Sequence, residues 1–159
     1  MTQHHQIAYP KGQPKAFYLL FSIEMWERFG YYAMRALLVL YMSNMFHFSD
    51  DKSYAIFGAF AALLYVTPVF GGKIGDVLIG YRLALIFGAV LLAAGYFLLG
   101  LHNNHLFYIG LGFIIVGNGY FKPSPASLLG KLYGPDDRRI QSGYTLFYMS
   151  INIGSFIGI

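Results

Sequence analysis

The 159-residue chain contains no cysteine, and only 11% of its residues are charged. The absence of cysteine excludes a disulfide framework and a thiolate metal site. Soluble domains carry about 25% charged residues, so the scarcity of charge argues against an ordinary soluble domain. The excess of Lys and Arg, a net charge of +4, is scattered between apolar stretches and forms no basic face. We therefore expect no nucleic-acid partner.

Apolar residues are abundant and are grouped into long runs. Hydrophobic residues make up 57% of the chain, and its 19 glycines are spread through the apolar stretches. A run of about 20 apolar residues is long enough to cross a bilayer as a helix. The sequence thus predicts one all-α domain over residues 1–159, a polytopic bundle whose partner is the lipid bilayer. The five expected spans are about 16–45, 53–70, 81–101, 105–129 and 140–159.

The placement of Lys and Arg sets the expected orientation, because cytoplasmic connectors carry an excess of both residues. Four connectors join the five spans. The first and third connectors hold one Lys or Arg, Lys52, whereas the N-terminal segment and the second and fourth connectors hold seven. We expect the N-terminus in the cytoplasm and the chain in the cell (inner) membrane. The first span is too long for the apolar core of a cleavable signal peptide. The seven residues are Lys11, Lys15, Lys73, Arg82, Lys131, Arg138 and Arg139.

A polar stripe interrupts the first span. It comprises Glu24, Glu27, Arg28, Tyr31, Tyr32 and Arg35. At about 100° per residue these side chains fall within a sector of about 140° on one helix face. Each of the four charges would cost about 2.5–3.5 kcal/mol at the centre of a bilayer, so they are expected to pair and to face water. The stripe predicts a transport pathway.

Pairing within this stripe has two interpretations. Glu24 and Arg28 have the i,i+4 spacing of an ion pair, and a ladder of such pairs could simply fix the packing of the helix. Alternatively, the proximity of Glu24 and Glu27 is functional, because two carboxylates in a low-dielectric cavity repel each other and favour proton uptake. The second interpretation is what a proton-coupled carrier requires.

Lys122 is the one Lys or Arg inside the fourth span. Counted at about 1.5 Å per residue, it lies at about the same depth as Glu24. We therefore expect it to contact Glu24 or Glu27 across the bundle. The alternative is a lysine that extends to the membrane interface. Pro123 and Pro125 follow and remove two backbone donors, which predicts a bent or loosened helix at this point.

The connector 71–80 joins the second and third spans on the expected cytoplasmic side. Its glycines, including Gly72 and Gly80, permit a tight turn. Asp76 and Arg82 are placed to interact with neighbouring helix ends. The alternative is an ordinary solvated loop.

No metal site and no enzyme are expected. His102 and His105 lie in a surface turn, and two ligands are too few for a metal centre. The sequence offers no nucleophile with an adjacent base, so nothing indicates a catalytic set.

Three sequence patterns can be compared with known families. The first span contains E-x-x-E-R-F-x-Y-Y, the fourth contains G-x-G-x-x-K-P, and the fifth contains F-Y-x-x-I-N-x-G-S. The matching residues are Glu24, Glu27, Arg28, Phe29, Tyr31 and Tyr32; Gly117, Gly119, Lys122 and Pro123; and Phe147, Tyr148, Ile151, Asn152, Gly154 and Ser155. Together they resemble the proton-dependent oligopeptide transporter family of the major facilitator superfamily, close to the bacterial di- and tripeptide permeases.

The resemblance implies roles for individual residues. Glu24, Glu27, Arg28, Arg35 and Lys122 would take part in proton coupling. Arg35 aligns with a family arginine that pairs with an acid on the seventh helix. The resemblance implies no cofactor other than the proton gradient. The implied peptide site is lined by Arg28, Tyr31, Tyr32, Arg35, Tyr65, Lys122, Tyr148 and Asn152.

The expected function is therefore proton-coupled symport of di- and tripeptides, with this chain as the N-terminal part of the carrier. The family moves substrate between two helix bundles, so the sixth helix and a C-terminal six-helix bundle are expected to be missing and to be needed for activity. A complete five-span protein is one alternative. A truncated, non-transporting membrane fragment is another, and a related carrier for a different small anionic or zwitterionic solute is a third.

Overall fold

The structure, a computed structural model, describes residues 12–159, so Lys11 lies outside the described part of the chain. Within that part the secondary structure is helical, which confirms the all-α prediction. The elements are α1 (Lys15–Phe46), α2 (Asp50–Ile74), the π-helical turn η1 (Gly75–Ile79), α3 (Tyr81–Leu99), α4 (Asn104–Phe121), α5 (Ser124–Gly130) and α6 (Arg139–Ile157).

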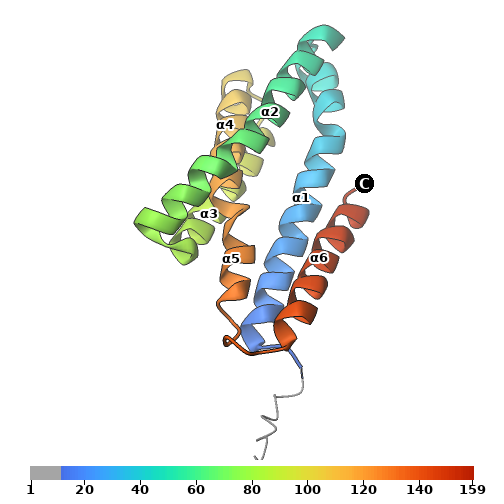
Figure 1. Cartoon of the computed structure of the whole chain (residues 1–159). Helices are drawn as coiled ribbons and strands as arrows, with labels where there is room; N and C mark the ends of the chain where they lie inside the picture. Colours follow the sequence, from blue (N-terminus) through green and yellow to red (C-terminus); the bar gives the residue numbers. More distant parts are fainter. Residues whose placement is uncertain (1–11) are drawn as a thin grey trace, which may run out of the picture.

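The helices form two groups that lie against each other (Figure 1). In one group α2 and α3 both pack on α4, and in the other α1 packs along α6. The contact of α1 with α2 and α5 joins the groups. Buried apolar side chains from all the long helices form the core, including Phe17, Met42, Phe60, Phe107 and Ile114.

Short side-chain caps start two of the helices. The Ser49 hydroxyl accepts a hydrogen bond from the Lys52 amide at the start of α2. The Asn103 side chain accepts from the amides of His105 and Leu106 at the start of α4. Such caps satisfy amides that have no partner inside the helix. Asn103 thus gives the turn between His102 and His105 a structural role.

The fourth expected span is divided into two helices. α4 ends at Phe121 with Lys122 as its C-cap, and α5 begins at Ser124 after Pro123. Proline has no amide hydrogen and its ring clashes with the carbonyl four residues earlier. The bent or loosened helix predicted from the two prolines is confirmed as a break, and Lys122 lies at that break.

The prediction of a connector over 71–80 is wrong for all but its last residue. α2 continues to Ile74 and passes directly into η1, so the chain turns only at Gly80, where φ is +77°. Gly71 serves close packing instead of a turn, because a Cβ there would overlap the carbonyl of Gly119 on α4. Small residues such as glycine let two helices in a membrane approach this closely.

Two helical segments of the described chain, 50–79 and 81–99, are long and apolar enough to cross a membrane by length and composition. Large apolar side chains also face outward on the other helices. Trp26 and Leu40 on α1, and Phe156 on α6, are more than half exposed. Exposed apolar surface of this extent marks contact with lipid or with other protein segments.

Candidate functional site

Arg28 is the centre of the polar stripe. Its Nε lies 3.3 Å from Glu24 Oε1, one helical turn away. The same guanidinium binds Oε2 of the neighbouring Glu27 through Nε and Nη2. The ion pair predicted between Glu24 and Arg28 is confirmed, and Arg28 is shared by both acids. The three side chains are at most 10% exposed, so solvent screening of these pairs is weak.

The helix α6 covers this ion-pair cluster from one side. A Cβ built on Gly154 would lie 3.0 Å from the Cβ of Arg28 and would overlap the backbone carbonyl of Met25. Glycine at position 154 therefore lets α6 approach α1 at the turn that carries the charges. This contact explains why a glycine occurs in the sequence pattern of the fifth span.

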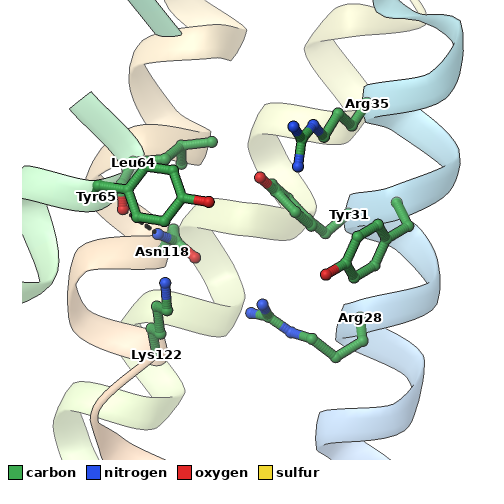
Figure 2. A pocket seen from close by; sticks show the side chains of 8 residues that line it. Arg28, Tyr31, Arg35, Leu64, Tyr65, Asn118 and Lys122 are labelled. Atoms are coloured by element: carbon green, nitrogen blue, oxygen red, sulfur yellow. Dashed lines mark hydrogen bonds between the residues drawn. The ribbon is translucent and has the colours of Figure 1, made fainter. Parts of the chain in front are cut away.

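On another side Arg28 borders a small pocket between α1, α2 and α4 (Figure 2). The pocket has a volume of about 80 Å³. A water molecule occupies about 30 Å³ of liquid, so the space suits one carboxylate group with a little water. The lining residues are Arg28, Tyr31, Tyr32, Arg35, Leu64, Tyr65, Asn118 and Lys122. We call this the cationic pocket, because it presents three positive side chains and no carboxylate.

Aromatic faces hold the cations in place. Lys122 Nζ lies 5.1 Å from the centre of the Tyr65 ring, and Arg28 Cζ lies 5.4 Å from the centre of the Tyr31 ring. Arg35 Cζ lies 5.8 Å from the Phe57 ring. These distances are within the range of cation–π attraction. The cations stay turned toward the pocket although they repel one another.

The predicted ion pair of Lys122 with Glu24 or Glu27 is not formed. Among residues 12–159, Lys122 makes no ion pair, and both acids bind Arg28. Arg28 has the advantage of lying on the same helix as the acids. Lys122 instead points into the cationic pocket opposite Arg28 (Figure 2) and stays within electrostatic range of both carboxylates. The alternative of a lysine that extends to the membrane interface does not fit this placement.

Six of the eight residues expected at a peptide site line the cationic pocket. The other two, Tyr148 and Asn152, lie on α6 with exposed side chains outside the pocket lining. Arg35 is exposed, and within the described chain it has no acidic partner. The roles assigned to all these residues remain predictions.

Two residues of the pocket, Leu64 and Asn118, were not predicted from the sequence. The Asn118 amide donates a hydrogen bond to the Leu64 carbonyl oxygen at 3.1 Å, which links α4 to α2. A sequence signal existed, because Pro68 follows Leu64 by four residues and cannot donate to it.

The four residues expected in the connector lie apart from the pocket. Gly72 is near Pro123, since a Cβ on Gly72 would be 3.4 Å from the proline Cβ. Asp76 is exposed in η1, Gly80 makes the turn, and Arg82 is exposed at the start of α3. Asp76 and Arg82 do not form an ion pair with each other. The expected interaction of Asp76 and Arg82 with neighbouring helix ends remains a prediction.

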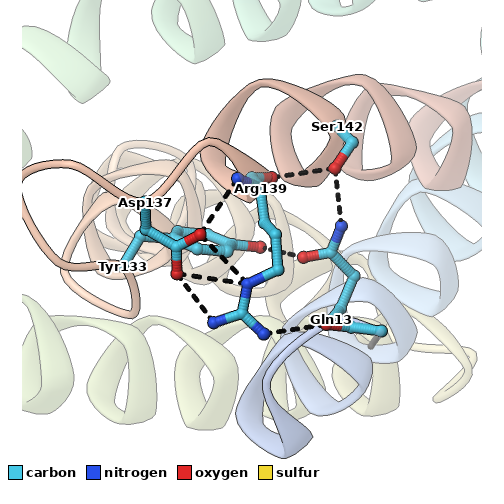
Figure 3. A network of polar contacts seen from close by, with 6 residues as sticks. Gln13, Tyr133, Asp137, Arg139 and Ser142 are labelled. Atoms are coloured by element: carbon cyan, nitrogen blue, oxygen red, sulfur yellow. Dashed lines mark hydrogen bonds and ion pairs between the residues drawn. The ribbon is translucent and has the colours of Figure 1, made fainter. Parts of the chain in front are cut away.

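A polar network that was not predicted from the sequence joins the start of α1 to the start of α6 (Figure 3). Gln13 donates to the Ser142 hydroxyl at 2.9 Å and accepts from the Tyr133 hydroxyl at 2.7 Å. Arg139 donates to both oxygens of Asp137 and to the Gly12 carbonyl. The hydrogen bonds from Arg139 lower the pKa of the Asp137 carboxyl.

Comparison with known proteins gives consistent matches. The sequence model of the POT family matches residues 82–159. The dipeptide and tripeptide permease B of Yersinia enterocolitica is 48% identical over 149 residues, which are 92% of this chain and 30% of the permease. The corresponding permease of Salmonella typhimurium matches with the same identity and the same shares of both chains.

A solved structure, the peptide transporter POT in complex with sulfate, superimposes with a TM-score of 0.89 at 34% identity. The match covers 95% of this chain and 32% of that one. The chain thus spans about a third of the length of its relatives, and its helices match the N-terminal half of a major facilitator superfamily bundle. The shared patterns, the helical arrangement and these relatives show that the chain is a membrane protein that belongs to the POT family.

Proposed function

We propose that this chain supplies the N-terminal helices of a carrier for proton-coupled symport of di- and tripeptides. The observation that carries the proposal is the cationic pocket, in which Arg28, Arg35 and Lys122 converge without a carboxylate in the lining. A peptide presents one carboxylate at its C-terminus, and Arg and Lys are its natural partners. Relatives named dipeptide and tripeptide permease B support the same substrate class.

The small size of the cationic pocket supports a site that holds only part of the peptide. A volume of about 80 Å³ is well below the 300–1,000 Å³ or so of typical ligand pockets. The peptide's carboxylate fits here, and the rest of the peptide needs walls from other segments, with Tyr148 and Asn152 of α6 among the candidates. We infer that a C-terminal six-helix bundle facing the pocket completes the site and allows alternating access.

Proton coupling would run through Arg28. As long as Glu24 and Glu27 are ionised, both hold its guanidinium. Protonation of one acid removes an acceptor charge and weakens that hold. Arg28 then becomes more available to the peptide carboxylate on the other side of its guanidinium. Proton binding thereby favours peptide binding, and by linkage peptide binding favours protonation. No cofactor other than the proton gradient and no enzymatic step is part of the proposal.

We further infer that the carrier resides in the cell (inner) membrane with its N-terminus in the cytoplasm. The support is the distribution of Lys and Arg among the connectors. The network of Gln13, Asp137 and Arg139 would then lie at the cytoplasmic end of the bundle.

Uptake of labelled dipeptide into vesicles tests the proposal. The complete gene product is reconstituted, and an inward proton gradient is imposed. We expect Glu24→Gln and Glu27→Gln each to abolish gradient-driven uptake while exchange of internal for external peptide persists. Asp51→Asn, an exposed acid on α2, is the matched control and should transport normally. Unchanged driven uptake in both glutamate variants would refute the proposal.

A second candidate is a carrier for another small anionic or zwitterionic solute. One solved relative, 36% identical with a TM-score of 0.87, is a POT family transporter in complex with 5-aminolevulinic acid, and it aligns over 93% of this chain and 32% of its own length. Competition separates the candidates. Di- and tripeptides should inhibit labelled uptake far more strongly than single amino acids if peptides are the substrate. A third possibility, a non-transporting membrane fragment, predicts no gradient-driven uptake of any of these solutes.

A further inference from the structure

A second hollow lies between α1 and α3 and shares no lining residue with the cationic pocket. It has a volume of about 420 Å³ and a largely apolar lining. We call it the lateral groove. Its lining residues are Ser22, Ile23, Trp26 and Glu27 of α1, Ala89, Leu92, Ala93 and Tyr96 of α3, and Phe121 of α4. Glu27 and Tyr96 are its titratable members, so one acid of the polar stripe also borders the lateral groove.

Both of these side chains carry an unsatisfied atom. Glu27 Oε2 binds Arg28, but Glu27 Oε1 is buried without a hydrogen-bond partner among residues 12–159. The Tyr96 hydroxyl is likewise buried and unpartnered within that range. Buried polar atoms are nearly always hydrogen-bonded to protein or water. Two such atoms, on two residues that line one groove, therefore call for a common explanation.

Tyr96 reaches the turn of α1 that carries Glu27. A Cβ built on Gly30 would lie 3.8 Å from Tyr96 Cε2 and 4.0 Å from Tyr96 Cζ, the atom that bears the hydroxyl. Gly30 and Glu27 are three residues apart and are thus neighbours on the helix surface. The phenol end of Tyr96 consequently lies beside the helix turn of the unsatisfied carboxylate oxygen.

We propose that Tyr96 is a positioning residue for Glu27, and that its hydroxyl donates the missing hydrogen bond to Oε1. An ionised carboxylate only accepts hydrogen bonds, and a phenol can donate one. Both oxygens are buried, so water in the largely apolar groove does not reach them, and the phenol is the donor that lies beside the carboxylate. Tyr96 thereby stabilises the ionised form of Glu27 and keeps its Oε2 on Arg28.

Other charged groups face Glu27 from the elements around it. Glu24 and Arg28 lie on α1, and Lys122 acts from the break between α4 and α5. From α6 the neighbour is the backbone at Gly154, which packs on Arg28 and brings no charge. These groups are unchanged when Tyr96 is replaced by Phe, so the substitution isolates the hydroxyl.

The consequence for transport rests on the proposed function. If protonation of Glu27 releases Arg28, then Tyr96 sets the pH at which the release occurs. Removal of the hydroxyl leaves the ionised carboxylate with one donor fewer, so protonation becomes easier. Peptide uptake should then respond to the gradient at a higher pH than in the unmodified protein.

Infrared difference spectroscopy of the complete gene product in lipid nanodiscs tests the inference without requiring transport. The carboxyl C=O band that disappears in Glu27→Gln is followed as the pH is varied. In Tyr96→Phe we expect its titration midpoint to rise by about one pH unit, the effect of losing a hydrogen bond worth about 1.4 kcal/mol. Tyr54→Phe, with an exposed ring at the far end of α2, should leave the midpoint in place.

A second control retains the phenol. Gly30→Ala introduces a methyl group at ordinary contact distance from the Tyr96 ring, so the midpoint should be unchanged. The helical circular dichroism of each variant is compared first to confirm folding. A Glu27 band that titrates at the same pH with and without the Tyr96 hydroxyl, or at a lower pH without it, would overturn the inference. So would the absence of a Glu27 band in both proteins.

The infrared experiment and the uptake experiment test the role of Tyr96 and the proposed function separately. If the unmodified protein takes up no peptide, the proposed function fails, and the band shift still decides the role of Tyr96. If uptake occurs but neither its pH profile nor the band moves in Tyr96→Phe, only the inference about Tyr96 fails.

Discussion

Asn118 on α4 donates a side-chain hydrogen bond to the Leu64 carbonyl oxygen on α2, at 3.1 Å and in a buried position. In a regular helix this oxygen would accept from the amide four residues later. That residue is Pro68, which lies inside α2 and has no amide hydrogen. Asn118 thus replaces the hydrogen bond that the proline removes, and it does so at the wall of the cationic pocket.

Asn118→Leu should therefore destabilise the protein by about 1–3 kcal/mol, the cost of a buried carbonyl left without a donor. Pro68→Ala restores an amide hydrogen at position 68, so the same substitution in that background should have a smaller effect. Thermal unfolding of the four proteins in detergent, followed by circular dichroism, gives the coupling between the two sites. Equal losses in both backgrounds would mean that the proline does not determine the role of Asn118.

The packing of α2 against α4 predicts a contrast between two glycines of the same helix. A Cβ on Gly119 would lie 3.0 Å from the Thr67 Cβ and 3.1 Å from the Thr67 carbonyl oxygen, whereas a Cβ on Gly112 would meet no atom within 4 Å. Gly119→Ala should push the helices apart and lower the unfolding temperature. Gly112→Ala should be neutral or stabilising, since Ala favours helix by about 1 kcal/mol over Gly. Unfolding temperatures of the two variants in one detergent provide the measurement, and a similar loss in both would contradict the packing argument.

The shared guanidinium of Arg28 predicts a non-additive stability series. Arg28→Met leaves Glu24 and Glu27 buried without their cation, and breaking a buried ion pair in this way costs about 3–5 kcal/mol. The triple variant that also carries Glu24→Gln and Glu27→Gln removes the uncompensated charges. At neutral pH we expect it to be more stable than Arg28→Met alone. Denaturation in detergent compares the two, and the opposite order would show that both acids are already neutral in the folded protein.

Patterns confined to one helix allowed the closest predictions from sequence. The ion pair of Glu24 and Arg28 follows from i,i+4 spacing, and the break after Lys122 follows from the chemistry of Pro123. Both depend on residues within a few positions of each other, where helix geometry is fixed. The family itself was also identifiable, because its patterns combine charges and glycines that apolar helices rarely carry.

Features that depend on a second helix were harder to predict. The glycines of 71–79 predicted a turn, but Gly71 packs against Gly119. Nothing in the local sequence distinguishes a glycine used for a turn from one used for helix packing. Lys122 was expected to bind the acids, but Arg28 already holds them from the same helix. The choice between partners depends on distances across the bundle, which sequence spacing does not contain. The roles of Tyr148 and Asn152 at a peptide site remain predictions.

The network that joins the starts of α1 and α6 predicts a pH dependence with a definite sign. Hydrogen bonds from Arg139 hold the pKa of Asp137 below its usual value in the folded protein. The group therefore binds a proton less readily when folded than when unfolded. Its contribution to stability is present above the unfolded pKa of about 4 and is lost as the pH falls through the lower folded value.

We accordingly expect Asp137→Asn to lower the unfolding temperature by a constant amount at pH 5–8, and by a shrinking amount as the pH falls below about 4. Arg139→Gln removes the donor, so the pH dependence assigned to Asp137 should disappear in that variant as well. Because Arg139 also holds the Gly12 carbonyl at 2.9 Å, the overall loss in Arg139→Gln should exceed that in Asp137→Asn. A difference between the unmodified protein and Asp137→Asn that grows under acid conditions would have the wrong sign and would exclude a lowered pKa as its cause.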